Sequence, residues 1–213
     1  CSRFREKILI KKIIIVGFGS AGYAAAATFR RLGCSDEIVV VDPKDADLVH
    51  PCGLPYALEG KALAEKLSLD LPLERMGIRK IRGRGVCLDP ARKLLHVSEG
   101  GCSFDLPFDK LLLSTGASPY IPPIPGIETA LGNGLYLLAS RDDLDALQQA
   151  LPEKKNGLVI GGGAIGLEAA AALRKKLPAV TIVEGKDHLL SGSLDRDMAD
   201  LVKQKLEENG ITV

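Results

Sequence analysis

The chain has 213 residues, of which 28 are basic and 27 acidic, so its formal net charge is +1. Hydrophobic residues make up 46% and charged residues 26%, an ordinary globular composition that excludes disordered and fibrous proteins. The balanced charge gives no signature of nucleic-acid or anionic-membrane binding, and no apolar run reaches the roughly 20 residues that span a bilayer. We therefore expect a soluble globular protein that binds neither nucleic acid nor membranes.

The first predicted elements form a strand–helix–strand unit. The β-branched run 11–16 (KKIIIV) predicts a buried parallel strand. The alanine-rich segment 20–32 predicts a helix that ends in basic residues before Gly33, and segment 37–41 (EIVVV) predicts the next strand. Together these elements make one βαβ unit.

The middle of the chain is less regular. Residues 54–67 are predicted to be helical, and residues 77–97, interrupted by glycines and a proline, are predicted to form small antiparallel strands in an insertion. Residues 110–113 (KLLL) predict another buried strand. It leads through Ser114-Thr115-Gly116-Ala117 into a proline-rich crossover or linker.

The second half repeats the opening pattern. Ser140 and Asp143 form a predicted capping box at the start of a helix that runs to about Leu151. The next elements are predicted, in chain order, as strand 158–160, helix 164–176, strand 180–183, helix 194–209 and the start of a strand at 211–213.

The two halves share a glycine pattern that indicates an internal duplication. Aligning Gly17 with Gly161 also aligns Gly19 with Gly163 and Gly22 with Gly166. The sequence thus predicts an α/β protein with two Rossmann-like βαβ dinucleotide-binding domains, residues 1–122 and 123–213. Because a doubly wound sheet needs more strands than the second half supplies, we expect the second domain to be incomplete and the chain to be C-terminally truncated.

Both glycine loops, GFGSAG at 17–22 and GGGAIG at 161–166, match G-x-G-x-x-G between a strand and a helix. The first glycine makes the turn, the second lets a pyrophosphate approach the backbone, and the third lets the helix pack on the strand. An acidic residue, Asp42 or Glu184, follows each loop at the end of the next strand, where a carboxylate can bind ribose hydroxyls. The alternative is a pair of ordinary glycine turns in a βαβ fold.

Two dinucleotide sites in one chain indicate a pair of redox cofactors, of which a nicotinamide feeding a flavin is the common combination. The Glu184 carboxylate would repel a 2′-phosphate, so NADH is favoured over NADPH. Lys186 lies close enough in sequence to keep that preference moderate.

Cys52, in the segment His-Pro-Cys-Gly-Leu-Pro-Tyr, is the unusual thiol among five cysteines (Cys1, Cys34, Cys52, Cys87 and Cys102). It precedes a predicted helix and follows the first βαβ unit, a position at the ligand-binding edge of the sheet where a thiol can be activated to a thiolate. The alternative is a buried structural cysteine. An odd number of cysteines without a Cys-x-x-Cys pair indicates neither a disulfide framework nor a metal site and favours a cytoplasmic protein.

The remaining thiols and histidines carry no flanking signal. We expect Cys34, Cys87 and Cys102 to be ordinary thiols, and His96 and His188 to be structural or solvent-facing.

Taken together, the twin glycine loops, the Cys-Gly-Leu-Pro-Tyr run and Ser114-Thr115-Gly116-Ala117 resemble the FAD- and NAD(P)-dependent pyridine nucleotide-disulfide oxidoreductases. The chain is most similar to the single-cysteine branch, which includes coenzyme A-disulfide reductases, NADH oxidases, NADH peroxidases and persulfide reductases. The resemblance covers essentially the whole chain. It implies a homodimer for the full-length protein.

The resemblance also assigns cofactor-binding residues by position. In the first domain, the residues implied to bind FAD are Gly17, Gly19, Ser20, Ala21, Gly22, Asp42, Thr115 and Gly116. In the second domain, those implied to bind NAD(P)H are Gly161, Gly163, Ala164, Ile165, Gly166, Glu168 and Glu184. For Glu168 the alternative is an exposed helix carboxylate.

Cys52 would lie beside the flavin and act as the catalytic residue. The implied enzyme passes a hydride from NADH to FAD and then electrons to Cys52, which reduces a small-molecule disulfide or persulfide, a peroxide or oxygen. One alternative is a flavin-dependent reductase of a protein electron carrier such as a ferredoxin. The other is a non-catalytic nucleotide-binding fragment.

Overall fold

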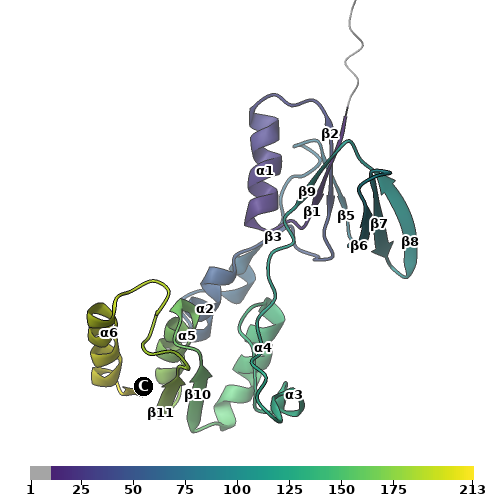
Figure 1. Ribbon diagram of the computed structural model, residues 1–213. Coiled ribbons are helices and arrows are strands. Elements are labelled where there is room, and N and C mark those ends of the chain that lie inside the picture. Colours follow the sequence, from purple (N-terminus) through teal and green to yellow (C-terminus); the bar gives the residue numbers. More distant parts are fainter. Residues whose placement is uncertain (1–10) are drawn as a thin grey trace, which may run out of the picture. The chain divides into compact units, whose positions relative to one another are not determined.

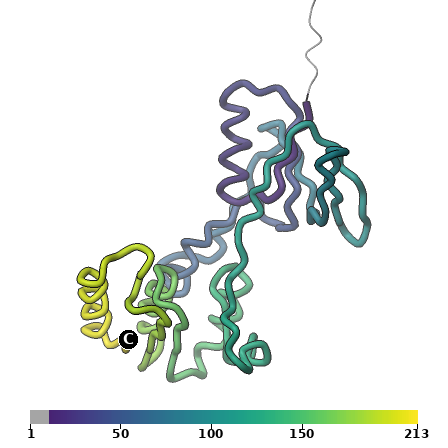
Figure 2. The backbone as a smooth tube through the Cα atoms, in the orientation of Figure 1, coloured from purple at the N-terminus to yellow at the C-terminus, as the bar shows by residue number. Residues whose placement is uncertain are grey.

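The computed structural model describes residues 11–213, so Cys1 lies outside the described residues. The described chain divides into two compact units, 11–49 with 68–117 and 50–67 with 118–213. Figure 2 follows the backbone through both units. The predicted boundary at residues 122 and 123 separates an FAD-binding from an NAD(P)H-binding domain. It depends on which residues bind each cofactor, so it stays a prediction.

The first unit is an α/β unit with three sheets. Its elements are β1 (Lys12–Val16), α1 (Ser20–Arg31), β2 (Glu37–Val41), β3 (Leu48–Val49), β4 (Ser68–Leu69), β5 (Ile78–Ile81), β6 (Arg84–Asp89), β7 (Leu94–Glu99), β8 (Cys102–Pro107) and β9 (Lys110–Leu113). The order β5-β2-β1-β9 forms a parallel sheet, β6-β7-β8 an antiparallel sheet, and β3 pairs with β4.

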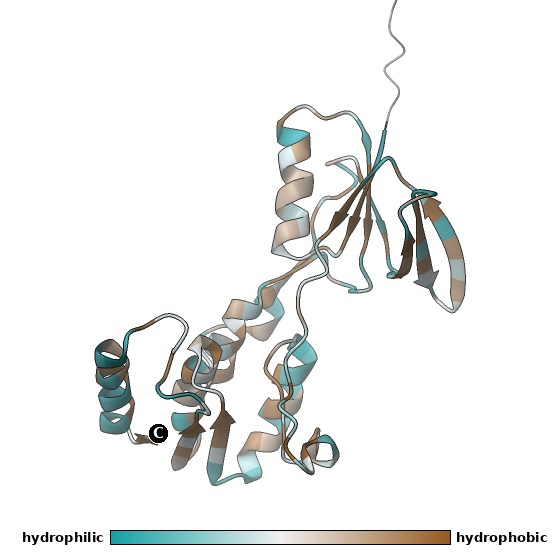
Figure 3. Ribbon diagram, in the orientation of Figure 1, coloured by the Kyte–Doolittle hydropathy of each residue, from teal (hydrophilic) through white to brown (hydrophobic). Residues whose placement is uncertain are grey.

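The parallel sheet of this unit is covered on both faces (Figure 1). Successive side chains of a strand point to opposite faces. Ile13 and Ile15 of β1 accordingly belong to the core that includes Ala26 of α1, whereas Ile14 and Val16 pack in the core with the inward side of β6-β8. Strands buried on two faces need continuous apolar runs, which explains the brown central strands in Figure 3.

The second unit contains the second βαβ motif. Its elements are the 3₁₀ turns η1 (Pro51–Gly53), η2 (Ala64–Leu67) and η3 (Leu151–Glu153), the helices α2 (Leu54–Glu59), α3 (Ile127–Ala130), α4 (Arg141–Ala150), α5 (Ala164–Arg174) and α6 (Arg196–Glu208), and the strands β10 (Asn156–Ile160), β11 (Ala179–Val183) and β12 (Ile211–Thr212). The strands form a parallel sheet in the order β10-β11-β12.

Packing in this unit joins segments that are distant in sequence. Leu58 of α2, Leu144 of α4, Ala170 of α5 and Ile182 of β11 share one buried core. The predicted capping box opens α4, since the Ser140 hydroxyl accepts from the Asp143 N–H and the Asp143 carboxylate accepts from the Ser140 N–H.

The two predicted βαβ motifs are confirmed, and both contain parallel strands. Two local predictions are wrong. Residues 78–81 are not part of an antiparallel insertion but pair in parallel with β2 in the main sheet. The two adjacent basic residues in Ile-Arg-Lys-Ile are tolerated at the edge of a sheet, and they interrupt the apolar run that would identify a strand of the main sheet. The helix predicted over 54–67 stops at Gly60, which adopts a left-handed conformation (φ 91°), and only a 3₁₀ turn follows at 64–67.

Within residues 11–213, no helix has the length and apolar character required to cross a membrane.

Candidate functional site: two glycine loops and an exposed thiol

The first glycine loop joins β1 to α1. Gly17 turns the chain with φ 91°, and its N–H donates to the Val41 carbonyl at 2.9 Å. A Cβ atom on Gly22 would come within 2.2 Å of the Gly17 carbonyl oxygen, so the third glycine allows α1 to pack on the loop. A Cβ atom on Gly19 would contact nothing within 4 Å. The second glycine therefore faces open space at the start of a helix, where N–H groups can bind an anion.

The second glycine loop repeats this geometry between β10 and α5. Gly161 has φ 109° and donates to the Val183 carbonyl at 2.8 Å. A Cβ atom on Gly166 would lie 2.0 Å from the Gly161 carbonyl oxygen, and one on Gly163 would contact nothing within 4 Å. Each of the three glycine roles expected from the motif thus has a geometric counterpart in both loops.

Asp42 closes the first loop from the end of β2. Its carboxylate accepts hydrogen bonds from the Phe18 N–H at 2.6 Å and from the Lys44 N–H at 2.9 Å, and it pairs with the Lys44 ammonium. Burial of Asp42, which is 2% exposed, raises its pKa and is the largest single influence. The Lys44 ammonium and the two N–H donors together outweigh burial and hold the pKa of Asp42 below its ordinary value.

Glu184 closes the second loop in the same way. Its carboxylate accepts from the Gly162 N–H at 2.7 Å and from the Lys186 N–H at 2.9 Å. The N–H groups of Lys186 and then Gly162 lower the pKa of Glu184 below its ordinary value. The carboxylates therefore stay ionised beside their loops, as a group that accepts hydrogen bonds from ribose hydroxyls must.

The segment after β9 lies against the first loop because β1 and β9 are parallel neighbours. The Ser114 hydroxyl donates to the Gly17 carbonyl at 2.7 Å. A Cβ atom on Gly17 would lie 2.2 Å from the Ser114 carbonyl oxygen and 2.8 Å from Cα of Thr115. Gly116 follows with φ 74°. The structure thus brings together three predicted site elements: the first loop, Asp42 and the segment 114–116.

A cavity of about 290 Å³ lies over the second loop. It is lined by Gly162, Gly163, Ala164, Glu184, Lys186 and residues 190–193. The Leu190 N–H donates to the Gly162 carbonyl at 2.9 Å, which holds this part of the chain against the glycine loop. A cavity bounded by a helix start, a carboxylate and hydroxyl groups fits a pyrophosphate and a ribose.

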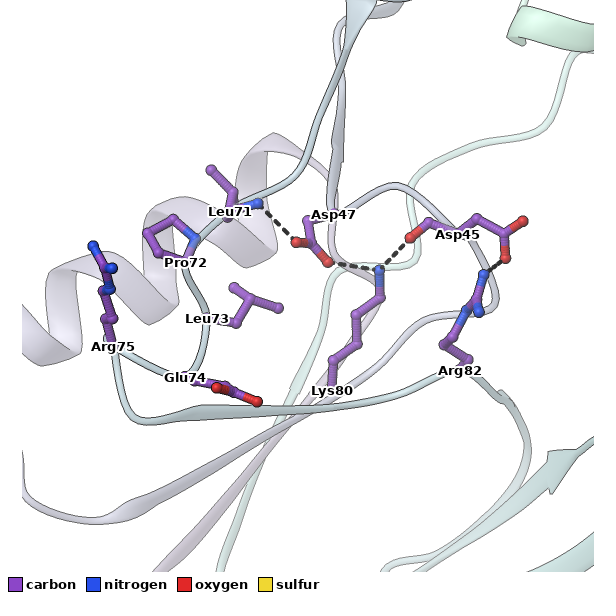
Figure 4. A pocket seen from close by; sticks show the side chains of 9 residues that line it. All are labelled: Asp45, Asp47, Leu71, Pro72, Leu73, Glu74, Arg75, Lys80 and Arg82. Carbon is purple, nitrogen blue, oxygen red and sulfur yellow. Dashed lines mark hydrogen bonds and ion pairs between the residues drawn. The ribbon is translucent and has the colours of Figure 1, made fainter.

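A cavity of about 540 Å³ lies beside β5 in the first unit and is seen in Figure 4. Four of its six charged side chains, those of Asp45, Asp47, Lys80 and Arg82, are paired with one another. The Lys80 ammonium contacts an Asp47 carboxylate oxygen at 2.9 Å and the Ala46 carbonyl at 3.1 Å, and Arg82 pairs with Asp45. Asp47 also accepts from the Leu71 N–H at 2.8 Å. These contacts hold the chain that follows Asp42, and we assign the cavity no ligand.

Cys52 lies in the turn η1, directly before α2, and is exposed. The helix that follows is firmly held within the second unit. Leu54 and Leu58 are buried at 1% and 0% exposure, and the Gln148 side-chain amide donates to the Ala57 carbonyl at 3.1 Å. The thiol therefore lies on a fixed segment of the second unit, whereas the first glycine loop belongs to the first unit. The predicted contact of Cys52 with a flavin stays a prediction.

The other predicted binding residues lie at helix starts. Ser20 and Ala21 are exposed in the first turn of α1, and Ala164 and Ile165 are exposed in the first turn of α5. Glu168 is exposed one turn further along α5. Their assignment to cofactor contacts stays a prediction.

The groups that bind the two carboxylates were not predicted from the sequence. These are the N–H groups of Phe18 and Gly162, each the first variable residue of its motif, and the Lys44 side chain beside Asp42. A signal was present, because a lysine follows each acidic residue at the second position, in Asp-Pro-Lys and in Glu-Gly-Lys.

Known proteins share this arrangement. An NADH oxidase of Methanocaldococcus jannaschii is 33% identical over 210 residues, which cover 95% of this chain and 46% of the relative. The structure of an NAD-dependent persulfide reductase from A. fulgidus matches 95% of this chain and 39% of its own, with a TM-score of 0.87 and 31% identity. A ferredoxin reductase of Rhodopseudomonas palustris (the CYP199A2 system) matches 95% of this chain and 49% of its own, with a TM-score of 0.84 and 26% identity.

The chain spans about half the length of the curated relatives that it matches. A family model described as pyridine nucleotide-disulphide oxidoreductase matches residues 11–213, which include both glycine loops and Cys52. This confirms the resemblance seen in the motifs. The chain belongs to the pyridine nucleotide-disulphide oxidoreductase family.

Proposed function

We propose that this chain is the cofactor-binding part of an NAD(P)H-dependent flavoprotein oxidoreductase in which Cys52 is the redox-active thiol. The observation that carries the proposal is the duplicated loop geometry. In both units an ionised carboxylate accepts a hydrogen bond from the glycine loop, and the second glycine of that loop is open at the start of a helix. One such site binds one dinucleotide, so two sites in one chain support an exchange of electrons between two cofactors.

In this proposal the first loop holds FAD. The helix start at Gly19, Ser20 and Ala21 binds the pyrophosphate, and Asp42 binds the adenine ribose. The close packing of Thr115 on Gly17 supports a role of the segment 114–116 in the same site.

The second loop then holds NAD(P)H, with Gly163, Ala164 and Ile165 at the pyrophosphate. Glu184 accepts from the ribose hydroxyls and repels a 2′-phosphate, which favours NADH. Lys186 lines the same cavity and reduces that discrimination. Glu168 faces solvent one turn along the helix, at the nicotinamide side of the proposed site.

Bound FAD and NAD(P)H would supply hydride and electron transfer. The chain supplies the thiol: Cys52 is exposed, so it can reach a small sulfur or oxygen compound. A single thiol can hold one sulfur of a substrate disulfide or persulfide as a mixed disulfide, or can be oxidised to a sulfenic acid by a peroxide. The names of the relatives, NADH oxidase and persulfide reductase, support oxygen and persulfides as acceptors.

The proposal is tested by reconstitution and by one matched pair of variants. The purified protein should take up FAD and be reduced by anaerobic NADH, with a weaker response to NADPH. Cys52→Ser should abolish NADH-dependent turnover of coenzyme A disulfide and persulfide without loss of bound FAD. Cys102→Ser removes another exposed thiol and should leave turnover unchanged. A protein that binds no FAD, or a Cys52→Ser variant with full turnover, would contradict the proposal.

A second candidate is a reductase of a protein electron carrier, supported by the likeness to a ferredoxin reductase. In that case Cys52 would be structural. The same variant distinguishes the two functions, because a carrier reductase would keep its NADH-dependent reduction of a ferredoxin after Cys52→Ser.

A further inference from the structure

The antiparallel sheet of the first unit carries a row of three chemically related side chains. Cys87 of β6 pairs directly with His96 of β7, and His96 pairs directly with Asp105 of β8. Residues that pair directly across antiparallel strands place their side chains on the same face, with Cβ atoms about 5 Å apart. The middle strand therefore presents a histidine between a thiol and a carboxylate.

This row lies on the outward face of the sheet. The alternate residues of β7, Leu95 and Val97, are 3% and 0% exposed and pack in the core against the parallel sheet. His96 lies between them in sequence, so it points the other way, and its side chain is 35% exposed. Asp105 is 45% exposed, and Cys87 is exposed as well. Solvent and small solutes can reach all three groups.

A β-bulge decides which residue of β6 faces His96. The pairing passes from Gly85–Val97 directly to Cys87–His96, so Val86 is the extra residue. Without this bulge, Val86 would face His96, and Cys87 would face Leu95 on the buried side. Bulges redirect side chains in this way and are common beside functional sites.

The His96–Asp105 contact fixes the histidine ring. Nδ1 of His96 lies against a carboxylate oxygen of Asp105. A ring that donates its Nδ1 proton to a carboxylate leaves Nε2 as the acceptor, and the carboxylate stabilises the charged ring that forms. A nucleophile, a base and a group that orients the base are the three parts of an activated thiol. The other charged side chains on this face of β6 are Arg84 and Asp89, and Asp89 is paired with Arg92.

We infer that Cys87 is a second reactive thiol, separate from Cys52, which exchanges with low-molecular-weight disulfides with His96 as its base. In this exchange the Cys87 thiol gives its proton to His96, and the thiolate attacks one sulfur of the disulfide. The new Cys87–sulfur bond forms as the substrate sulfur–sulfur bond breaks. The leaving thiolate takes the proton from His96, so atoms and electrons balance and the product is a thiolated protein.

The chain offers a matched control thiol. Cys102 belongs to the same sheet and is also exposed, but it pairs with Glu99 rather than with a histidine. The modification of both thiols can be measured in the same protein sample, since proteolysis places them on different peptides. The inference does not depend on the proposed oxidoreductase function, because the readout needs neither FAD nor NADH.

The test is the rate at which oxidised glutathione thiolates each cysteine near neutral pH, measured by quenching and peptide mass spectrometry. Cys87 should react about tenfold faster than Cys102. His96→Gln should lower the rate at Cys87 to that of Cys102 and leave Cys102 unchanged. Asp105 is a positioning residue, so Asp105→Asn should slow Cys87, and Asp105→Glu should restore most of the rate.

Circular dichroism should be the same for all variants, because the three side chains lie on the exposed face. Equal rates at Cys87 and Cys102 in the unaltered protein would overturn the inference. So would a His96→Gln variant that keeps the fast rate at Cys87.

Discussion

The carboxylate of Glu184 accepts a hydrogen bond from the backbone N–H of Gly162 at 2.7 Å, across 22 residues of chain. Asp42 makes the same bond to the Phe18 N–H in the other βαβ motif. In each case the residue that is proposed to bind a ribose also holds the loop that is proposed to bind the phosphates. If the proposed sites are correct, loop conformation and cofactor recognition depend on the same carboxylate, and both should change in a variant that lacks it.

Replacing Glu184 by alanine should weaken NADH binding by about tenfold, because it removes a charged acceptor from two N–H groups and from the ribose. The loss should be smaller for NADPH, since the repulsion of its 2′-phosphate is removed as well. Titration of both nucleotides by calorimetry measures the change. Asp187→Asn removes a charge three residues away that is 88% exposed and should change neither affinity. An unaltered NADH affinity in Glu184→Ala would contradict the assignment of the second site.

The folded protein should lose stability in acid partly through Asp42. Its folded-state pKa lies below the ordinary value of 3.8, so the carboxylate contributes stability above about pH 4 that is lost as the pH falls through the folded-state pKa. Asp42→Asn should be less stable than the unaltered protein at about pH 6, and the gap should narrow by about pH 3. Urea unfolding at the two pH values tests this. A gap that is the same at both would mean that the ionised form of Asp42 gives no stability.

In the second glycine loop, alanine at the second glycine should impair dinucleotide binding, whereas alanine at the third glycine should impair folding. Gly163→Ala adds a methyl group that meets no protein atom within 4 Å, so the fold should be kept while dinucleotide binding falls by at least about tenfold. Gly166→Ala places a Cβ atom 2.0 Å from the Gly161 carbonyl oxygen and should destabilise the second unit by about 1–3 kcal/mol. Thermal unfolding and NADH titration of the two variants separate binding from folding. A Gly163→Ala protein that binds NADH normally would show that no phosphate lies at this glycine.

Lys80→Ala should destabilise the protein by about 3 kcal/mol, because it leaves the carboxylate of Asp47 without its cation in a nearly buried pair. The side chains of Lys80 and Asp47 are only 10% and 13% exposed. The control is Arg82→Ala, since Arg82 and Asp45 form an ion pair at the rim of the same cavity that is 58% and 88% exposed. Its loss should cost under about 1 kcal/mol. Denaturant unfolding compares the two variants, and equal losses would contradict the distinction between buried and exposed pairs.

The sequence by itself determined the features that depend on short stretches of chain. The strands 11–16 and 37–41, the helix after each glycine loop and the capping box at Ser140 follow from local side-chain patterns and are present at nearly the predicted limits. The motif spacing also indicated Asp42 and Glu184, because a βαβ unit brings the end of its second strand back to its own glycine loop.

The tertiary structure alone decided the features that depend on distant partners. Residues 78–81 joined the main sheet because β2 offers them a free edge, which no local pattern reveals. The segment with Cys52 packs in the core of α4 and α5, about a hundred residues away in sequence. Cys87 faces His96 only because a bulge at Val86 shifts the strand register by one residue, and such a shift moves every later side chain to the other face. Register and packing partners are properties of the whole fold, so these placements required the structure.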